Sequence, residues 1–170
     1  MTLKIESIEI YGYGKWVDHK IDHITNLQLF YGENEAGKTT IMSFIHSILF
    51  GFPSKLSSEL RYEPKSSSQY GGRLFLTGTQ YGDVQIERVR GKANGNVTVT
   101  FANGDTGGEE WLEKILSGLD KTTYQALFSF NLAGLQKVQQ LNREKLNRYF
   151  LSVGTIGNEQ LLKVADKLQI

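Results

Sequence analysis

The sequence predicts an α/β fold on three observations. A glycine-rich stretch at residues 32–39, GENEAGKT, lies between a short apolar run and a helical pattern. Residues 72–102 alternate apolar and polar side chains, and turn signals divide them as in antiparallel strands. From residue 109 the apolar spacing lengthens to that of helices. A strand, a loop, a helix and a β-meander together indicate an α/β domain.

Length and composition set limits on the class of protein. The chain has 170 residues, enough for one domain or for one domain with an appended piece. Hydrophobic residues make up 39% and charged residues 22%, which argues against a disordered chain and against a membrane-spanning one. The absence of cysteine excludes a disulfide scaffold, a thiolate zinc site and a cysteine nucleophile. The net charge of +1 requires neither nucleic acid nor a membrane as partner. The first residues show no secretory signal pattern, so we expect a cytoplasmic location.

The first 31 residues predict three strands. Residues 3–10 alternate imperfectly, and the phase slips between Ile5 and Ile8, as in a bulged strand. Gly12 and Gly14 mark a turn, and residues 17–21 form the second strand. Residues 26–31, NLQLFY, are mostly apolar and are typical of a strand covered on both faces of a sheet.

Helices are predicted after the glycine-rich stretch and again in the C-terminal part. Residues 41–52 have the apolar spacing of a helix with one buried face, and Gly51 and Pro53 end it. Residues 53–71 contain six serines and two prolines without any period, which indicates a mobile surface loop or an insertion without function. Beyond the meander, helices are expected over 111–119, 121–128, 135–151 and 158–170.

The glycine-rich stretch matches the phosphate-loop motif G-x-x-x-x-G-K-[ST] in full. Gly32 and Gly37 permit backbone conformations that a side chain would block, and the loop amides then form an anion nest. Lys38 should reach the β- and γ-phosphates, Thr39 should offer its hydroxyl to Mg²⁺, and Thr40 should contact the α-phosphate. The residues predicted to bind ATP are Gly32, Asn34, Glu35, Ala36, Gly37, Lys38, Thr39 and Thr40, with Lys38 also as the catalytic candidate. The alternative is a glycine-rich turn that binds nothing.

A catalytic carboxylate is not evident after this loop. Hydrolysis needs a carboxylate that positions water and metal, usually at the end of an apolar strand. Asp83 precedes a strand, Asp105 lies in a polar turn and Glu87 lies within an alternating strand. We therefore expect this chain alone to bind ATP without turnover.

Four stretches resemble one family. They are residues 4–22 (KIESIEIYGYGKWVDHKID), 27–52 (LQLFYGENEAGKTTIMSFIHSILFGF), 62–76 (YEPKSSSQYGGRLFL) and 123–136 (TYQALFSFNLAGLQ). Together they resemble the N-terminal segment of an SbcC/SMC-like ATPase head, and most closely the bacterial YhaN-type AAA family. The resemblance implies a P-loop NTPase with the N-terminal lobe of an ABC ATPase: a mixed sheet, an antiparallel β-meander and C-terminal helices.

The same resemblance implies a head that is split in sequence. Residues 1–157 would be the N-terminal part of the head, and residues 158–170 would begin a helix that leads to a coiled coil. The signature motif and the Walker B carboxylates would come from a C-terminal half. A second head would join in a nucleotide-dependent dimer, and DNA and a nuclease subunit are further expected partners.

Three residues outside the loop are implied by the resemblance with open alternatives. Asn131 stands where the family carries a metal- and water-sensing glutamine, and Gln136 is the second choice for that role. Asn131 could equally be a turn or a helix cap. Lys15, in the Gly-Lys turn, is a candidate contact of the nucleotide phosphates or ribose, and a solvated lysine is the alternative.

Two clusters allow further interpretations. Tyr11, Tyr13 and Trp16 could stack on an adenine base, although core packing is the simpler interpretation. Arg88, Arg90 and Lys92 could meet DNA phosphates, although a solvated face is the default.

Three functions remain open from the sequence. They are an ATP-dependent protein of DNA repair or DNA end processing, a nucleotide-binding regulatory fragment without turnover or DNA contact, and a metabolic kinase.

Overall fold

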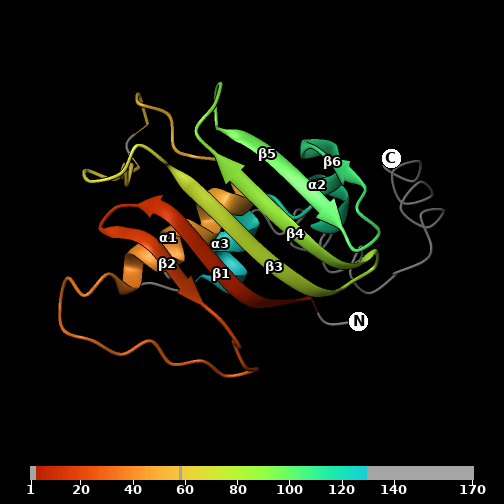
Figure 1. The fold of residues 1–170 in the computed structure, drawn as a ribbon, viewed down its shortest axis with the longest axis horizontal. Coiled ribbons are helices and arrows are strands. Elements are labelled where there is room, and N and C mark those ends of the chain that lie inside the picture. The colour runs from red at the N-terminus through yellow and green to blue at the C-terminus, as the bar shows by residue number, and fades with distance from the viewer. Residues whose placement is uncertain (1–2, 58, 130–170) are drawn as a thin grey trace, which may run out of the picture. The chain divides into compact units, whose positions relative to one another are not determined.

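The computed structural model describes residues 3–57 and 59–129. The chain divides into two compact units, Met1–Ile115 and Leu116–Ile170. The first unit contains a twisted sheet with helices α1 and α2 (Figure 1). The predicted helices over 135–151 and 158–170 and the predicted boundary at residue 157 lie outside the described residues.

The described strands form one six-stranded sheet in the order β2-β1-β3-β4-β5-β6. Every pairing between them is antiparallel. The strands are β1 (Lys4–Tyr13), β2 (Trp16–Ile21), β3 (Gly71–Thr79), β4 (Gly82–Val89), β5 (Asn96–Phe101) and β6 (Thr106–Gly107). The predicted β-meander is confirmed as β3, β4 and β5, and β6 extends it by two residues that the sequence did not indicate.

Two described helices belong to the first unit and one to the second. Helix α1 (Lys38–Phe50) contacts β3 and β4, and α2 (Glu109–Ile115) contacts β5. Helix α3 (Lys121–Phe128) lies in the second unit, where the Asp120 side chain caps it by accepting from the Thr123 amide at 2.7 Å. None of the described helices combines the length and the apolar character that crossing a bilayer requires.

The core lies between one face of the sheet and α1. The apolar residues buried there are Ile8, Ile10, Leu74, Leu76, Val84, Ile86 and Val99 from the strands and Ile41, Phe44, Ile48 and Leu49 from α1. The Tyr70 ring stacks on Tyr13 with centroids 5.7 Å apart and on Phe52 at 4.2 Å. Burial raises the pKa of Tyr70 to about 12, so its phenol stays neutral at physiological pH.

The opposite face of the sheet is polar, as the alternating pattern predicts. The Arg73 guanidinium donates to the Glu9 carboxylate at 2.6 Å, and the Tyr11 hydroxyl donates to Glu87. Tyr11 therefore lies in a polar network on this face, and the adenine-stacking interpretation stays a prediction for it. Tyr13 is 1% exposed, so the same interpretation is wrong for Tyr13.

Strand β1 carries the irregularity that its sequence predicts. The pairing with β3 shifts register between Ile5 and Ser7 and again between Ile10 and Gly12. Gly12 lies inside β1 and not in the turn, and no side chain would fit there, since a Cβ would lie only 2.1 Å from the Gln69 carbonyl oxygen. The turn itself is made by Gly14, whose φ of 59° is left-handed.

The segment after α1 has no helix or strand in its described residues, but two points attach it to the core. The Gly14 amide donates to the Tyr62 carbonyl at 2.7 Å, and the Arg90 amide donates to the Tyr70 carbonyl at 2.8 Å. Tyr70 at its end is buried. The mobility predicted for residues 53–71 stays a prediction.

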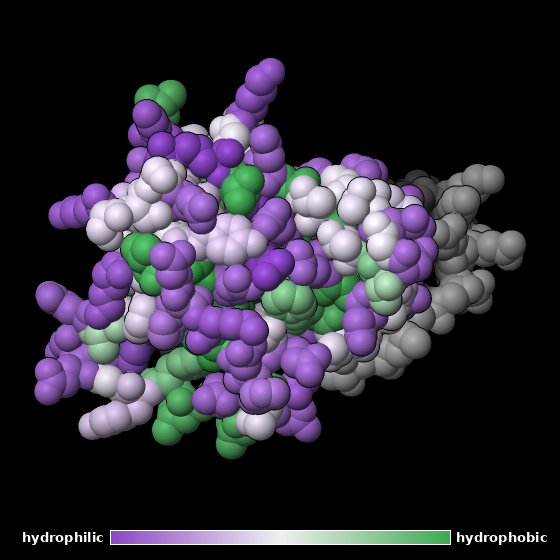
Figure 2. Space-filling view, viewed as in Figure 1, coloured by the Kyte–Doolittle hydropathy of each residue, from purple (hydrophilic) through white to green (hydrophobic). Residues whose placement is uncertain are grey.

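The strand predicted over residues 26–31 is wrong for the described chain. This segment forms no strand, and Leu27, Leu29 and Tyr31 are 89%, 82% and 95% exposed. Apolar (green) side chains protrude at the lower edge of the face in Figure 2, over the segment that Figure 1 draws between β2 and α1. A strand covered on both faces needs neighbours, and the described sheet offers it none. The parallel part of the expected mixed sheet is therefore absent from the described residues.

Arg88 is also not the surface residue that a DNA contact would require. Its side chain is 1% exposed, donating from Nε to the Ile48 carbonyl and from Nη2 to Glu109 Oε1, both at 2.9 Å. Arg88 thus connects the end of α1 with the start of α2. Arg90 and Lys92 are exposed, as a solvated face requires.

Candidate functional site

The glycine-rich loop leads directly into α1. Gly37 is the N-cap residue, with φ 96° and ψ 15°, and no side chain caps the helix. The first amides of a helix have no intrahelical partner, and the aligned peptide dipoles make this end positive. The start of α1 is therefore suited to a phosphate group.

Two glycines allow the loop to close against its surroundings. A Cβ on Gly37 would lie 2.7 Å from both Lys15 Cε and Trp16 Nε1, and a Cβ on Gly32 would lie 2.8 Å from Ala36 Cβ. Gly37 also has a left-handed φ, which side chains rarely adopt. A side chain would therefore be too close to its neighbours at both glycines, and at Gly37 it would also be strained by the left-handed backbone.

We expect Gly37→Ala to lower the free energy of unfolding by about 2–5 kcal/mol, because left-handed strain adds to overpacking. Gly104→Ala is the matched control. Its φ is similar at 90°, but nothing lies within 4 Å of the added methyl, so only the strain of about 1–2 kcal/mol remains. Urea unfolding of the two variants without nucleotide measures both effects. Equal losses would show that the contacts of Gly37 are not tight.

Lys38 folds back over the loop. Its ammonium donates to the carbonyl oxygens of Gly32 and of Glu33, the latter at 2.7 Å. The side chain is exposed, so a phosphate group can exchange these neutral acceptors for its own charged oxygens.

The other motif residues line the same turn. Asn34, Glu35 and Thr39 are exposed, whereas Ala36 and Thr40 are half-buried. The Thr39 hydroxyl is an oxygen ligand of the kind that Mg²⁺ takes beside phosphate oxygens. No cluster of three or more His, Asp or Glu that could hold a metal ion occurs among residues 3–57 and 59–129. Asn131 and Gln136, the other predicted residues, lie outside the described part.

The tip of the β1–β2 hairpin contacts the loop from a distant part of the sequence. Lys15 Nζ donates to the Glu35 carbonyl at 2.7 Å, and Trp16 Nε1 donates to the Gly37 carbonyl at 3.4 Å. The Trp16 ring also stacks on His19, with centroids 4.4 Å apart. Sequence reasoning placed Lys15 near the nucleotide but did not foresee that these residues bind the loop backbone. No local pattern signals a contact across 20 residues.

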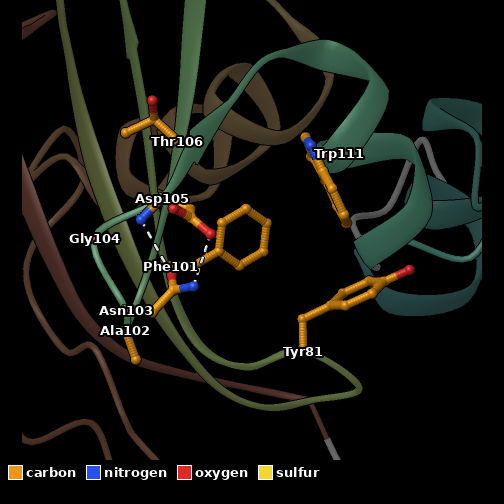
Figure 3. A pocket seen from close by; sticks show the side chains of 8 residues that line it. All are labelled: Tyr81, Phe101, Ala102, Asn103, Gly104, Asp105, Thr106 and Trp111. Atoms are coloured by element: carbon orange, nitrogen blue, oxygen red, sulfur yellow. Dashed lines mark hydrogen bonds between the residues drawn. The ribbon is translucent and has the colours of Figure 1, made fainter.

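A separate pocket of about 860 Å³ lies at the β5–β6 turn (Figure 3). Three aromatic side chains meet there with perpendicular rings: Tyr81, Phe101 and Trp111 have centroids 5.1–6.2 Å apart. The turn is held by Asn103, which donates to Asp105 at 2.7 Å. Because the rings pack edge to face on each other, this cluster attaches α2, through Trp111, to the β3–β4 turn and to the end of β5. None of the residues that line it belongs to the phosphate loop.

The chain is similar to known proteins in sequence and in fold. The family described as AAA domain matches residues 3–168. "Uncharacterized protein YhaN" from Bacillus subtilis (strain 168) is 38% identical over 168 residues, which cover 98% of this chain and 17% of YhaN. A chain from the study "Structural biochemistry of ATP-driven dimerization and DNA stimulated activation of SMC ATPases" superposes with a TM-score of 0.53 at 15% identity. That alignment covers 88% of this chain and 98% of the other.

These similarities confirm two of the predictions. At 15% identity, the SMC ATPase structure shows the fold, and it confirms the α/β P-loop NTPase class. The family match covers nearly the whole chain and agrees with the identity to YhaN. The chain therefore belongs to the AAA domain family, as the phosphate loop and the stretches around it predict.

Proposed function

We propose that the chain is the ATP-binding N-terminal half of an SMC-like ATPase head. The observation that carries this proposal is the phosphate loop at the uncapped start of α1, where Gly37 has the left-handed conformation that the motif needs. The similarity to an AAA domain family and to an SMC ATPase fold supports it. We further propose that the completed head acts in DNA repair or DNA end processing.

Within this proposal the loop binds the nucleotide tail. The amides of Asn34 and Glu35 and the first amides of α1 surround the β-phosphate, and the Ala36 amide joins them by exchanging its 3.1 Å bond to the Glu33 carbonyl for a phosphate oxygen. Lys38 pairs with the β- and γ-phosphates, and Thr39 holds Mg²⁺, which neutralises charge on the phosphate oxygens. Asn131, with Gln136 as second choice, contacts the same metal.

A C-terminal half of the same head is the first proposed partner. Leu27, Leu29 and Tyr31 alternate along the chain, as side chains on one face of a strand do, yet all three are exposed. A further part of the protein that pairs with this segment and covers its face would bury these side chains and bring carboxylates to the loop. Because the chain spans only 17% of YhaN, such a further part is compatible with the length of this relative.

Further partners rest on the likeness to SMC ATPases. The related structure comes from work on ATP-driven dimerization and on activation by DNA. We propose a second head in a nucleotide-dependent dimer, a coiled coil that begins near residue 158, DNA, and a nuclease subunit, all in the cytoplasm. The alternative is a regulatory fragment that binds nucleotide without turnover or DNA contact.

Complementation separates these two functions. We expect the chain alone to show no ATP turnover above background, and the addition of the C-terminal segment of a YhaN-type protein to give turnover of roughly 1 per second. Leu29→Asp should reduce this gain at least about tenfold, because a charge in the new strand pairing opposes burial. A steady-state phosphate-release assay measures both.

Leu56→Asp is the matched control, since Leu56 is 100% exposed and lies in the loop after α1. We expect it to leave complementation unchanged. An unchanged rate with Leu29→Asp would exclude the exposed segment as the contact. No turnover in any mixture would favour the regulatory fragment.

A further inference from the structure

The two contacts from the β1–β2 hairpin fall on a particular pair of loop residues. Lys15 binds the carbonyl of Glu35, and Trp16 binds the carbonyl of Gly37. Glu35 and Gly37 are the residues of the phosphate loop with left-handed backbones, at φ 66° and 96°. The hairpin therefore contacts the loop at its two left-handed residues, of which Glu35 has the conformation that side chains disfavour.

The Trp16 contact adds to the helical hydrogen bond that directs the peptide at the start of α1. In a trans peptide the carbonyl and the following N–H point in opposite directions. The carbonyl of Gly37 accepts from the Ile41 amide of α1 at 3.1 Å and from Trp16 Nε1 at 3.4 Å, so the amide of Lys38 points out of the N-terminal end of α1. The Lys38 amide is one of the free donors at the start of α1.

The hairpin tip itself is held firmly against α1. Tyr13, just before the tip, is buried, and its hydroxyl lies 2.7 Å from Ser47 Oγ and 3.1 Å from the Ser43 carbonyl, both on α1. On the other side, the Gly14 amide donates to the Tyr62 carbonyl at 2.7 Å. The tip of the β1–β2 hairpin is thus anchored to α1, the helix that follows the phosphate loop.

We infer that Lys15 and Trp16 are positioning residues, which hold the phosphate loop from behind in the conformation that receives a nucleotide triphosphate. This inference rests on the proposed function, because it assumes that the loop binds a nucleotide. Lys15 acts on the main chain of Glu35 and not on the nucleotide phosphates. Trp16 is a second donor to the Gly37 carbonyl, beside the Ile41 amide of α1, and so supports the peptide that precedes the helix.

The dissociation constants of ATP–Mg²⁺ and ADP–Mg²⁺ test this, measured by titration calorimetry on the whole chain. We expect Lys15→Met to weaken both nucleotides by about 5- to 20-fold, and Trp16→Phe, which loses a longer hydrogen bond, by about 2- to 5-fold. Lys15→Arg should restore most of the affinity, because a guanidinium also donates to the carbonyl. Since Lys15 is exposed, its variants should unfold within about 2 °C of wild type without nucleotide.

Trp111→Phe is the control, as the chain has two tryptophans and Trp111 lies in the separate aromatic pocket. It should bind both nucleotides as wild type does, and its single remaining indole, Trp16, should change its emission on ATP binding. This emission change reports the contact with the loop, which a purely structural role would not produce.

Three outcomes overturn the inference in distinguishable ways. Wild-type affinity in both Lys15→Met and Trp16→Phe would remove the positioning role and leave the proposed function intact. A loss for ATP at least about tenfold larger than for ADP would assign Lys15 to the terminal phosphate. No binding by the wild type or by Trp111→Phe would remove the proposed function, and the inference with it.

Discussion

Lys38→Ala is expected to abolish most of the thermal stabilisation that ATP–Mg²⁺ gives the wild-type chain. At a hundredfold excess over the dissociation constant, binding to the folded state stabilises it by about 2.7 kcal/mol. For a chain of this size that corresponds to a rise in Tm of about 5–10 °C. Lys38 extends from the first residue of α1 over the loop, so its exposed ammonium can pair with an entering phosphate. Differential scanning fluorimetry with and without ATP–Mg²⁺ measures the shift.

The control for Lys38→Ala is Lys92→Ala, an exposed lysine in the β4–β5 turn. It should keep the full stabilisation, because the charge it removes lies outside the loop. Without nucleotide, both variants should unfold near the wild-type temperature, since exposed lysines contribute little to stability. A wild-type chain that shows no shift at any ATP concentration would contradict the nucleotide site itself.

The second large effect concerns stability. Arg88→Ala should lower the free energy of unfolding by about 3–5 kcal/mol, because it empties a large buried volume and leaves the Ile48 carbonyl without its donor. This carbonyl is one of the last four of α1, which have no intrahelical partner. Loss of the ion pair with Glu109 adds less, since the Glu109 side chain is 53% exposed. Tm should fall by roughly 6–20 °C.

Two variants divide the Arg88 effect into its parts. Arg88→Met keeps the volume of the side-chain stem and removes the donors, so we expect a smaller loss of about 1–3 kcal/mol. Arg90→Ala changes the same residue type two positions later, where the side chain is 55% exposed, and should cost less than about 0.5 kcal/mol. A loss for Arg88→Ala no larger than for Arg90→Ala would refute the role of Arg88 in joining α1 and α2.

The local sequence pattern was sufficient to predict the elements whose packing partners lie within the described chain. Helix α1 ends at Phe50 before Gly51, and the meander follows the alternation of Leu74, Leu76 and their neighbours. Each of these elements finds its partners close in sequence or in the same sheet. The phosphate loop could also be predicted from the sequence, because its geometry requires glycine at position 37 and the motif therefore contains it.

Pattern failed where a residue's environment depends on distant chain segments. Residues 26–31 have the composition of a buried strand, but burial requires neighbouring strands, which composition alone cannot supply. Arg88 shares the buried face of β4 with Val84 and Ile86, although its charge is typical of a surface residue; there the end of α1 offers a carbonyl that needs a donor. Trp16 contacts Gly37 only because the hairpin folds back on the loop.

The bare segment at Leu27, Leu29 and Tyr31 also has a consequence for how the chain behaves at high concentration. Six residues in a row, NLQLFY, carry no charge, no proline and no glycine, which is the composition of segments that assemble into cross-β aggregates. An exposed segment of this composition offers its backbone hydrogen-bonding groups to the same segment of another copy. Under the proposed function, pairing with the C-terminal half would remove this route to aggregation, so the chain alone should be the less soluble form.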